Sequence, residues 1–112
     1  MGTDVVSVLD QVFEDDVLDS GDIARALKTS PRSVARWQAN EVSPRRESEE
    51  RLLEVKAVVD LLRQHLRPGA ARLWIRSPDP DLGYEKPIDL IAGGEYRRVI
   101  GAILAMAEGV TA

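Results

Sequence analysis

The sequence predicts an all-α protein in which several short helices are arranged around one long helix. Apolar residues recur every three or four positions along most of the 112 residues, which is the spacing of one helix face. No stretch alternates apolar and polar residues as a half-buried strand does. Ser-Pro, Pro-Gly and Gly-Gly pairs interrupt the pattern where helices are expected to begin or end. A chain of this length forms one compact domain, or a small core with a helical appendage.

The N-terminal residues predict two helices. The apolar side chains between residues 4 and 14 share one helix face, which consists of Val5, Val8, Leu9, Val12 and Phe13. Asp15-Asp16 ends this helix. Ser20 then precedes a short helix over residues 21–28, in which Ile23, Ala24 and Leu27 form the buried face.

Two Ser-Pro pairs predict the next two helices. Ser30 is placed to N-cap a helix with Pro31 in its first position, which runs to about residue 39 and is stopped by Asn40. Ser43-Pro44 repeats the signal at the start of a long helix over residues 44–66. Its apolar positions form the narrow seam of one helix packed along another, within the chain or between chains: Leu52, Val55, Val59, Leu62 and Leu66.

The C-terminal third predicts three further helices. Pro68 opens a helix that carries Leu73, Trp74 and Ile75, and we expect Trp74 to be a buried structural residue. Residues 77–86 form an ordered loop in which Leu82 and Tyr84 pack, and a helix over residues 87–92 follows. A final helix ends at Gly109, and its expected apolar face consists of Tyr96, Val99, Ile100, Ile103, Leu104 and Ala107.

Residues 21–39 have the features of a helix-turn-helix. Ala24 is the small residue that lets the second helix approach the first, and Val34 and Trp37 are spaced to lock the angle between them. Lys28 stands where such turns commonly carry Gly, and it is accommodated if its backbone stays helical. We therefore expect an N-terminal helix-turn-helix region over residues 1–46, and a long helix with a small C-terminal helical domain over residues 47–112.

The charge distribution favours an anionic partner for this region. Residues 1–24 carry a net charge of −7, residues 25–46 of +5 and residues 47–112 of −2, which together give the −4 of the whole chain. An acidic total opposes nucleic-acid binding, but a local basic segment is a recognised electrostatic footprint.

The candidate DNA-binding residues lie in and after the second helix of the motif. Its exposed N-terminal half presents Ser30, Arg32, Ser33 and Arg36 to base edges, where an arginine can bind guanine through two hydrogen bonds. Arg45 and Arg46 are placed to contact phosphates. The alternative is that these arginines form the solvated face of an ordinary helical hairpin.

The composition argues against catalytic and metal-dependent chemistry. The chain has no cysteine and one histidine, His65, so we expect no metal site and no cofactor. The acidic pairs Asp15-Asp16 and Glu49-Glu50 are better explained as a helix end and a helix start. We therefore expect a protein that is not an enzyme, and the lack of a long apolar stretch or signal segment predicts a cytoplasmic location without membrane contact.

The C-terminal half resembles the toxin-binding domain of the Xre/MbcA/ParS family of antitoxins. The motifs that carry the resemblance occur in order: Arg72-Leu73-Trp74-Ile75-Arg76-Ser77-Pro78-Asp79-Pro80, then Lys86-Pro87-Ile88-Asp89-Leu90, then Gly94-Glu95-Tyr96-Arg97-Arg98, then Gly109-Val110-Thr111-Ala112. Upstream, residues 30–37 are similar to the second helix-turn-helix helix of the same family. The resemblance spans roughly residues 20–112.

The resemblance implies both a partner and a mode of action. Members of the family hold a RES-domain toxin, which consumes NAD⁺, inactive in a hetero-oligomer, and they regulate their own operon by binding operator DNA through the helix-turn-helix. We therefore expect an antitoxin that forms a homodimer within such a hetero-oligomer. The alternative is a stand-alone helix-turn-helix transcriptional regulator.

The last residues are the candidates for closing the toxin's active site. Gly109, Val110, Thr111 and Ala112 are small and follow a helix stop, so they can enter a narrow pocket, and a terminal carboxylate suits a site built for phosphates. Glu108 and either Arg97 or Arg98 are expected at the rim of this contact. The alternative is that these terminal residues are frayed and dispensable.

Overall fold

A computed structural model describes residues 4–109 of the chain, and within them every regular element is a helix. The elements in order are α1 (Val5–Phe13), η1 (Glu14–Asp16), α2 (Ser20–Ala26), α3 (Pro31–Gln38), α4 (Arg46–His65), α5 (Pro68–Ile75), η2 (Pro80–Leu82), α6 (Pro87–Ala92) and α7 (Tyr96–Ala107), where η marks a 3₁₀ helix. The all-α prediction is confirmed. The molecule is elongated, with extents of 49 × 25 × 22 Å.

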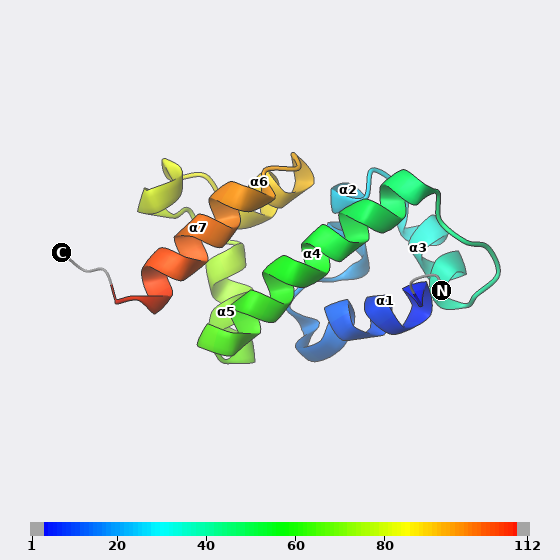
Figure 1. The fold of residues 1–112 in the computed structure, drawn as a ribbon, viewed down its shortest axis with the longest axis horizontal. Helices are drawn as coiled ribbons and strands as arrows, with labels where there is room; N and C mark the ends of the chain where they lie inside the picture. The colour runs from blue at the N-terminus through cyan, green and yellow to red at the C-terminus, as the bar shows by residue number, and fades with distance from the viewer. Residues whose placement is uncertain (1–3, 110–112) are drawn as a thin grey trace.

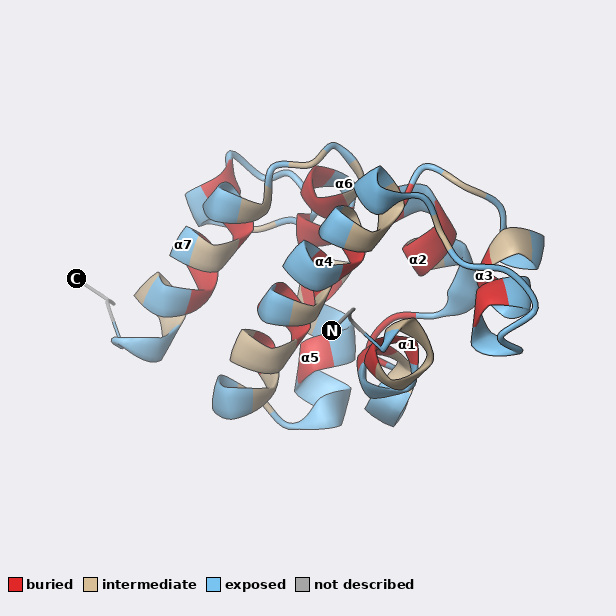
Figure 2. Cartoon of the chain, turned by 45° about the vertical axis from the view of Figure 1, so that its right-hand side comes forward, coloured by how far each residue is buried: buried red, intermediate tan, exposed pale blue. Residues whose placement is uncertain are grey.

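The long helix α4 lies at the centre of the molecule. It runs between α1–α3 at one end and α5–α7 at the other, and it packs against α1 and α7 (Figure 1). Its buried residues are Leu52, Val55, Val58, Val59 and Leu62, so the predicted seam packs within the chain, although Leu66 is only partly buried. Figure 2 shows buried residues in the helices of both ends, and these belong to one apolar cluster. The division at residues 46 and 47 stays a prediction.

Local capping explains where α2 and α3 begin. Asp19 N-caps α2, because its Oδ1 accepts the backbone N–H of Asp22 at 2.9 Å while Asp22 Oδ2 accepts the N–H of Asp19 at 2.9 Å. Ser30 N-caps α3 as predicted and accepts the N–H of Ser33 at 3.1 Å. Asn40 follows α3 with a φ of 59°, the left-handed conformation expected of a helix stop.

The start of α4 differs from the prediction. The helix begins at Arg46 rather than at Pro44, and Arg45 is its N-cap residue, with an extended backbone and no side-chain cap. Pro44 is instead partly buried in the preceding loop, where it lines a hollow together with Trp37. The Ser43-Pro44 pair therefore lies in the loop, and the helix starts two residues after its proline.

Four apolar positions of the C-terminal end that were expected to pack are exposed instead. Leu73 is 70% exposed and Tyr84 is 71% exposed, while Leu82 is buried as expected. In α5, Ala71 and Ile75 face the core, because they lie one turn apart on the opposite side from Leu73. In α7 the buried face consists of Val99, Ala102 and Ile103, whereas Leu104 and Ala107 are exposed.

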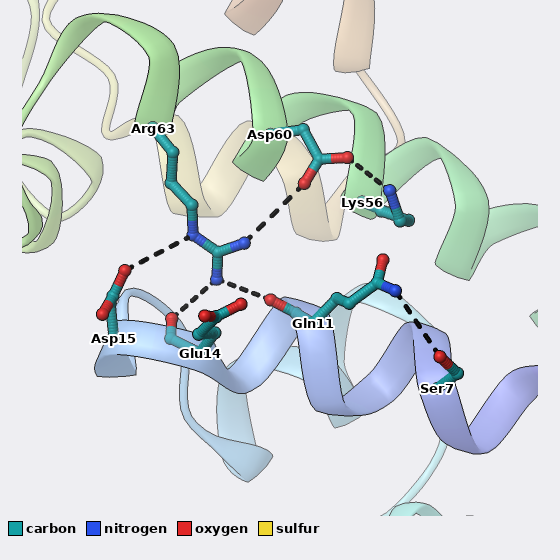
Figure 3. Close-up of polar contacts among 7 residues, drawn as sticks. All are labelled: Ser7, Gln11, Glu14, Asp15, Lys56, Asp60 and Arg63. Atoms are coloured by element: carbon teal, nitrogen blue, oxygen red, sulfur yellow. Dashed lines mark hydrogen bonds and ion pairs between the residues drawn. The ribbon is translucent and has the colours of Figure 1, made fainter.

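Three arginines from α4 and the α5 region connect the two ends of the molecule. Arg63 donates to the carbonyl oxygens of Gln11 and Glu14, both at 2.6 Å, and so caps the end of α1 (Figure 3). Arg72 donates to the Asp15 carbonyl at 2.6 Å. These bonds hold the turn in which Asp15 and Asp16 have φ values of 64° and 54°.

Arg76 makes the third connection. It donates to the Val17 carbonyl at 2.8 Å and forms an ion pair with Asp22, which is only 15% exposed. Burial raises the pKa of Asp22. The hydrogen bond from the backbone N–H of Asp19 and the charge of Arg76 lower this pKa, but burial is the larger effect. Arg76 therefore links the end of α5 directly to α2.

Candidate partner-binding surfaces

A cationic surface covers α3 and the start of α4. Arg32, Arg36 and Arg45 are exposed, and none of them forms an ion pair with another residue of the 4–109 range. Arg46 is also exposed and lies 3.5 Å from Glu50 on the next turn of α4. Arg25 pairs with Asp89 of α6 at 3.2 Å, so its charge is directed toward the C-terminal end. Three unpaired arginines therefore lie on α3 and its flank, where Glu41 is also exposed.

The turn between α2 and α3 differs from the prediction for Lys28. Its φ is 59°, so the backbone there is left-handed rather than helical. The N–H of Thr29 reaches back to the Ala24 carbonyl at 2.9 Å and closes the end of α2. Lysine therefore occupies the position and conformation for which glycine is usual. Val34 and Trp37 are buried, as the helix-turn-helix prediction requires.

A hollow of about 410 Å³ lies beside this turn. It is bordered by the α2–α3 turn, by α3 and by the first turn of α4, and its lining includes Lys28, Thr29, Ser33, Ser43, Arg45 and Ser48, with Glu47 also present. Hydroxyl groups and two cations suit an anion such as a backbone phosphate. The sequence placed Ser33 and Arg45 among the DNA-binding residues, and the structure brings both to this hollow.

The opposite end of the molecule carries the residues expected to contact a toxin. The chain leaves α7 at Gly109, which has a φ of 63° and donates its N–H to the Met106 carbonyl at 3.1 Å. Glu108 and Gly109 are both exposed. Val110, Thr111 and Ala112 lie outside the described residues.

Arg97 and Arg98 lie at the other end of α7. Eleven residues separate Arg97 from Glu108, so about 16 Å of helix lies between them. Arg98 pairs with Glu95 at 3.4 Å and with Glu85 at 3.2 Å, and the hydrogen bonds that its guanidinium donates to these carboxylates raise its pKa. Arg97 is exposed. The structure therefore does not bring these arginines together with Glu108 in one rim.

Sequence reasoning missed an apolar hollow between α5 and the end of α7. Its volume is about 320 Å³, and it is lined by Leu66, Ala70, Leu73, Trp74, Ser77 and Met106. We call these six residues the α5 hollow. Four of them are spaced i, i+3, i+4 and i+7 along residues 70–77, and this spacing was the available signal. Trp74 is partly buried and also lines this outer surface.

The described residues contain no group of three or more His, Cys, Asp or Glu side chains placed to hold a metal ion. Among the same residues, no helix is long and apolar enough to cross a lipid bilayer.

Comparison with known proteins identifies the family. No protein-family model matches the chain. Over 90 residues it is 49% identical to the mycobacterial cidal antitoxin MbcA of Mycobacterium tuberculosis, which covers 80% of this chain and 77% of MbcA, and the match to MbcA of Mycobacterium bovis is the same. Over 88 residues it is 28% identical to the probable mycobacterial cidal antitoxin Rv3188 of M. tuberculosis, covering 79% and 75% of the two chains.

The fold matches a solved relative along almost its whole length. A chain in the crystal structure of the M. tuberculosis MbcT–MbcA toxin–antitoxin complex superposes with a TM-score of 0.78 and 38% sequence identity, covering 97% of this chain and 95% of that one. The resemblance seen in the motifs of residues 20–112 is thus confirmed. On its sequence identity and its fold, the chain belongs to the MbcA family of mycobacterial cidal antitoxins.

Proposed function

We propose that this chain is the cytoplasmic antitoxin of a toxin–antitoxin pair, and that it inhibits a RES-domain toxin, which consumes NAD⁺, by covering the active site of that toxin. The observation that carries the proposal is the match over 97% of the chain to a member of a toxin–antitoxin complex. Inhibition by coverage requires binding and no chemical step, so no catalytic residue is assigned to this chain.

The C-terminal end of α7 supports a direct block of the toxin. Gly109 turns the chain out of the helix at an exposed position, and the small residues 110–112 follow. Small side chains enter a narrow nucleotide pocket with little steric conflict. Residues 109–112 are therefore the inhibitory segment in this proposal, with Glu108 beside it.

Deletion of residues 110–112 tests the block. The truncated antitoxin is expected to keep its melting temperature, since the described core ends before these residues, and to lose inhibition in an NAD⁺-consumption assay with the co-expressed toxin from the neighbouring gene. Deletion of Gly2 and Thr3, at the opposite end, is the matched control. Full inhibition by the C-terminal truncation at equal concentration would show that the helical body blocks the toxin.

A second proposed function, operon autoregulation, rests on the unpaired arginines of α3. Arg32 and Arg36 are exposed on the helix that an operator would meet, and Arg45 flanks it. A homodimer would present two such helices to a two-fold symmetric operator. A stand-alone regulator would bind operator DNA equally well but would leave the toxin active.

DNA binding is tested by titrating labelled upstream DNA with antitoxin variants. Arg32→Ala or Arg36→Ala should weaken operator binding by about 1–3 kcal/mol if each reads a base, whereas Arg45→Ala should weaken binding to all sequences alike. Arg67→Ala, exposed at the other end of the molecule, is the control. Unchanged operator affinity of the Arg32/Arg36 double variant would exclude the second function.

A further inference from the structure

The α5 hollow is an apolar surface that the fold of this chain leaves uncovered. Leu73 lines this surface and is 70% exposed, although Ala71 and Ile75 of the same helix are fully buried. The helix α5 therefore has two apolar faces, of which one packs in the core and the other points outward. A single exposed leucine is ordinary, but here it is continuous with the other apolar side chains of the hollow, and a contiguous apolar patch is typical of a binding surface.

The polar groups around the α5 hollow are already occupied within the chain. The indole N–H of Trp74 donates to Asp79 Oδ2 at 2.9 Å, and the hydroxyl of Ser77 donates to the Leu73 carbonyl at 2.6 Å. The hollow thus offers apolar contact and little hydrogen bonding. Its volume of about 320 Å³ has room for one or two apolar side chains of a partner.

The position of the hollow indicates which partner covers it. Met106 lines the hollow, and its carbonyl accepts the N–H of Gly109, where the inhibitory segment begins. Three residues extend over about 10 Å at most. A toxin whose active site holds residues 110–112 must therefore lie against this end of α7 and close to the α5 hollow.

We propose that the α5 hollow is the anchor of the antitoxin on its toxin, and that it receives an apolar side chain from the toxin surface beside the active-site entrance. This inference rests on the proposed inhibitory function. In this proposal the α5 hollow provides most of the binding affinity for the toxin, while residues 109–112 block the toxin's active site. Leu73 is the central contact, because it is the most exposed large apolar side chain of the hollow.

Substitution of Leu73 tests the anchor in the full chain. Leu73→Glu is expected to weaken toxin binding by about 10- to 100-fold, as loss of a central apolar contact commonly does, while Leu73→Met stays close to wild type. The isolated variant should melt like the parent, since Leu73 contributes little to the core. Leu53→Glu is the matched control, because Leu53 is 40% exposed on α4, about 20 Å along the helix from Leu66.

The fluorescence of Trp74 shows which partner or segment occupies the α5 hollow. In a Trp37→Phe background, toxin binding should shift the Trp74 emission to the blue as water leaves the hollow. A shift caused by deleting residues 110–112 from the free antitoxin would show that this segment covers the hollow instead. A shift that depends on antitoxin concentration without toxin, and that Leu73→Glu abolishes, would assign the hollow to a second copy of the chain. Either result overturns the proposal.

The failure of this proposal can be told from failure of the proposed function. If the wild-type antitoxin neither binds nor inhibits the toxin, both proposals are wrong. If it binds and inhibits, and Leu73→Glu binds with unchanged affinity, only the anchor is wrong. If Leu73→Glu weakens binding but inhibits fully at saturating concentration, while deletion of 110–112 binds without inhibiting, the division of tasks is correct.

Discussion

The two ends of α4 present opposite kinds of surface. At the N-terminal end, α3 and its flank carry the unpaired cations Arg32, Arg36 and Arg45, and the hollow beside them is lined by hydroxyl groups. At the C-terminal end, the hollow beside α7 is apolar and its few polar groups are bonded internally. A surface of unpaired charge suits a polyanion, and an apolar hollow suits a protein. One small chain therefore offers two chemically distinct sites.

The two surfaces nevertheless share one core. The apolar cluster includes Val8 and Val34 at one end and Val99 and Ile103 at the other, with the buried face of α4 between them. Arg63, Arg72 and Arg76 add polar links across the same junction. Because the core is shared, a substitution that destabilises one end is expected to destabilise the fold at the other end as well.

The largest loss of stability is expected when a buried side chain of α4 is truncated. Leu62 is fully buried in α4, and Leu62→Ala should lower the free energy of unfolding by about 3 kcal/mol. If the ends share a core, single-tryptophan variants that retain Trp37 or Trp74 will report one coincident thermal transition. Leu53→Ala, at an exposed position of α4, should cost less than about 0.5 kcal/mol. Two separate transitions would show that the two ends fold independently.

A smaller loss is expected when the polar link between the ends is cut. Arg76→Ala removes the partner of Asp22 and the donor to the Val17 carbonyl, which leaves a poorly hydrated carboxylate. Because Arg76 is itself 37% exposed, we expect a loss of about 2 kcal/mol rather than the larger cost of a fully buried pair. Urea unfolding measures the loss, and Arg67→Ala is the control. An unchanged midpoint would mean that water replaces the arginine.

Local chemistry made much of this fold predictable. The helix starts at Pro31, Pro68 and Pro87 and the stop at Gly109 follow from backbone constraints that act over a few residues. The exposure of Leu73 could not be predicted in this way, because α5 carries two apolar faces and only its tertiary neighbours determine which one is buried. The contact of Arg72 with Asp15 spans 57 residues and leaves no local pattern.

The candidate sites were predictable to different degrees. The cationic residues of α3 were found from charge and helix position, and the structure places them together on one exposed surface. The α5 hollow was missed, since Leu73 and Trp74 were assigned to the core on hydrophobicity alone. The roles of residues 109–112 came from the family resemblance and stay a prediction.

Salt should separate the two surfaces. If Arg45 and Arg46 contact two phosphates, operator affinity should fall about 3.5-fold when the salt concentration rises from 100 to 200 mM, whereas toxin affinity should change little. Fluorescence titration at each salt concentration measures both. A Leu73→Glu variant should weaken toxin binding and leave the salt dependence of DNA binding intact. Equal salt sensitivity of the two partners would contradict the comparison, because it would mean that charge also dominates the C-terminal surface.

The smallest effect concerns the pH dependence of the link at Asp22. Burial raises the folded-state pKa of this carboxyl above its ordinary value of 3.8. Between these two pKa values, the folded state binds a proton at Asp22 more readily than the unfolded state does. Asp22 therefore stabilises the folded state increasingly as the pH falls through the folded-state pKa toward 3.8. As the pH rises, this contribution is lost. The difference in unfolding free energy between wild type and Asp22→Asn should therefore shift in favour of wild type as the pH is lowered from 7 to 4. Urea unfolding at each pH measures this difference, and the titration of the Asp22 side chain by NMR gives the pKa directly. A shift in the opposite direction would show that the ion pair with Arg76 outweighs burial, and that the link between the two ends is strongest at neutral pH.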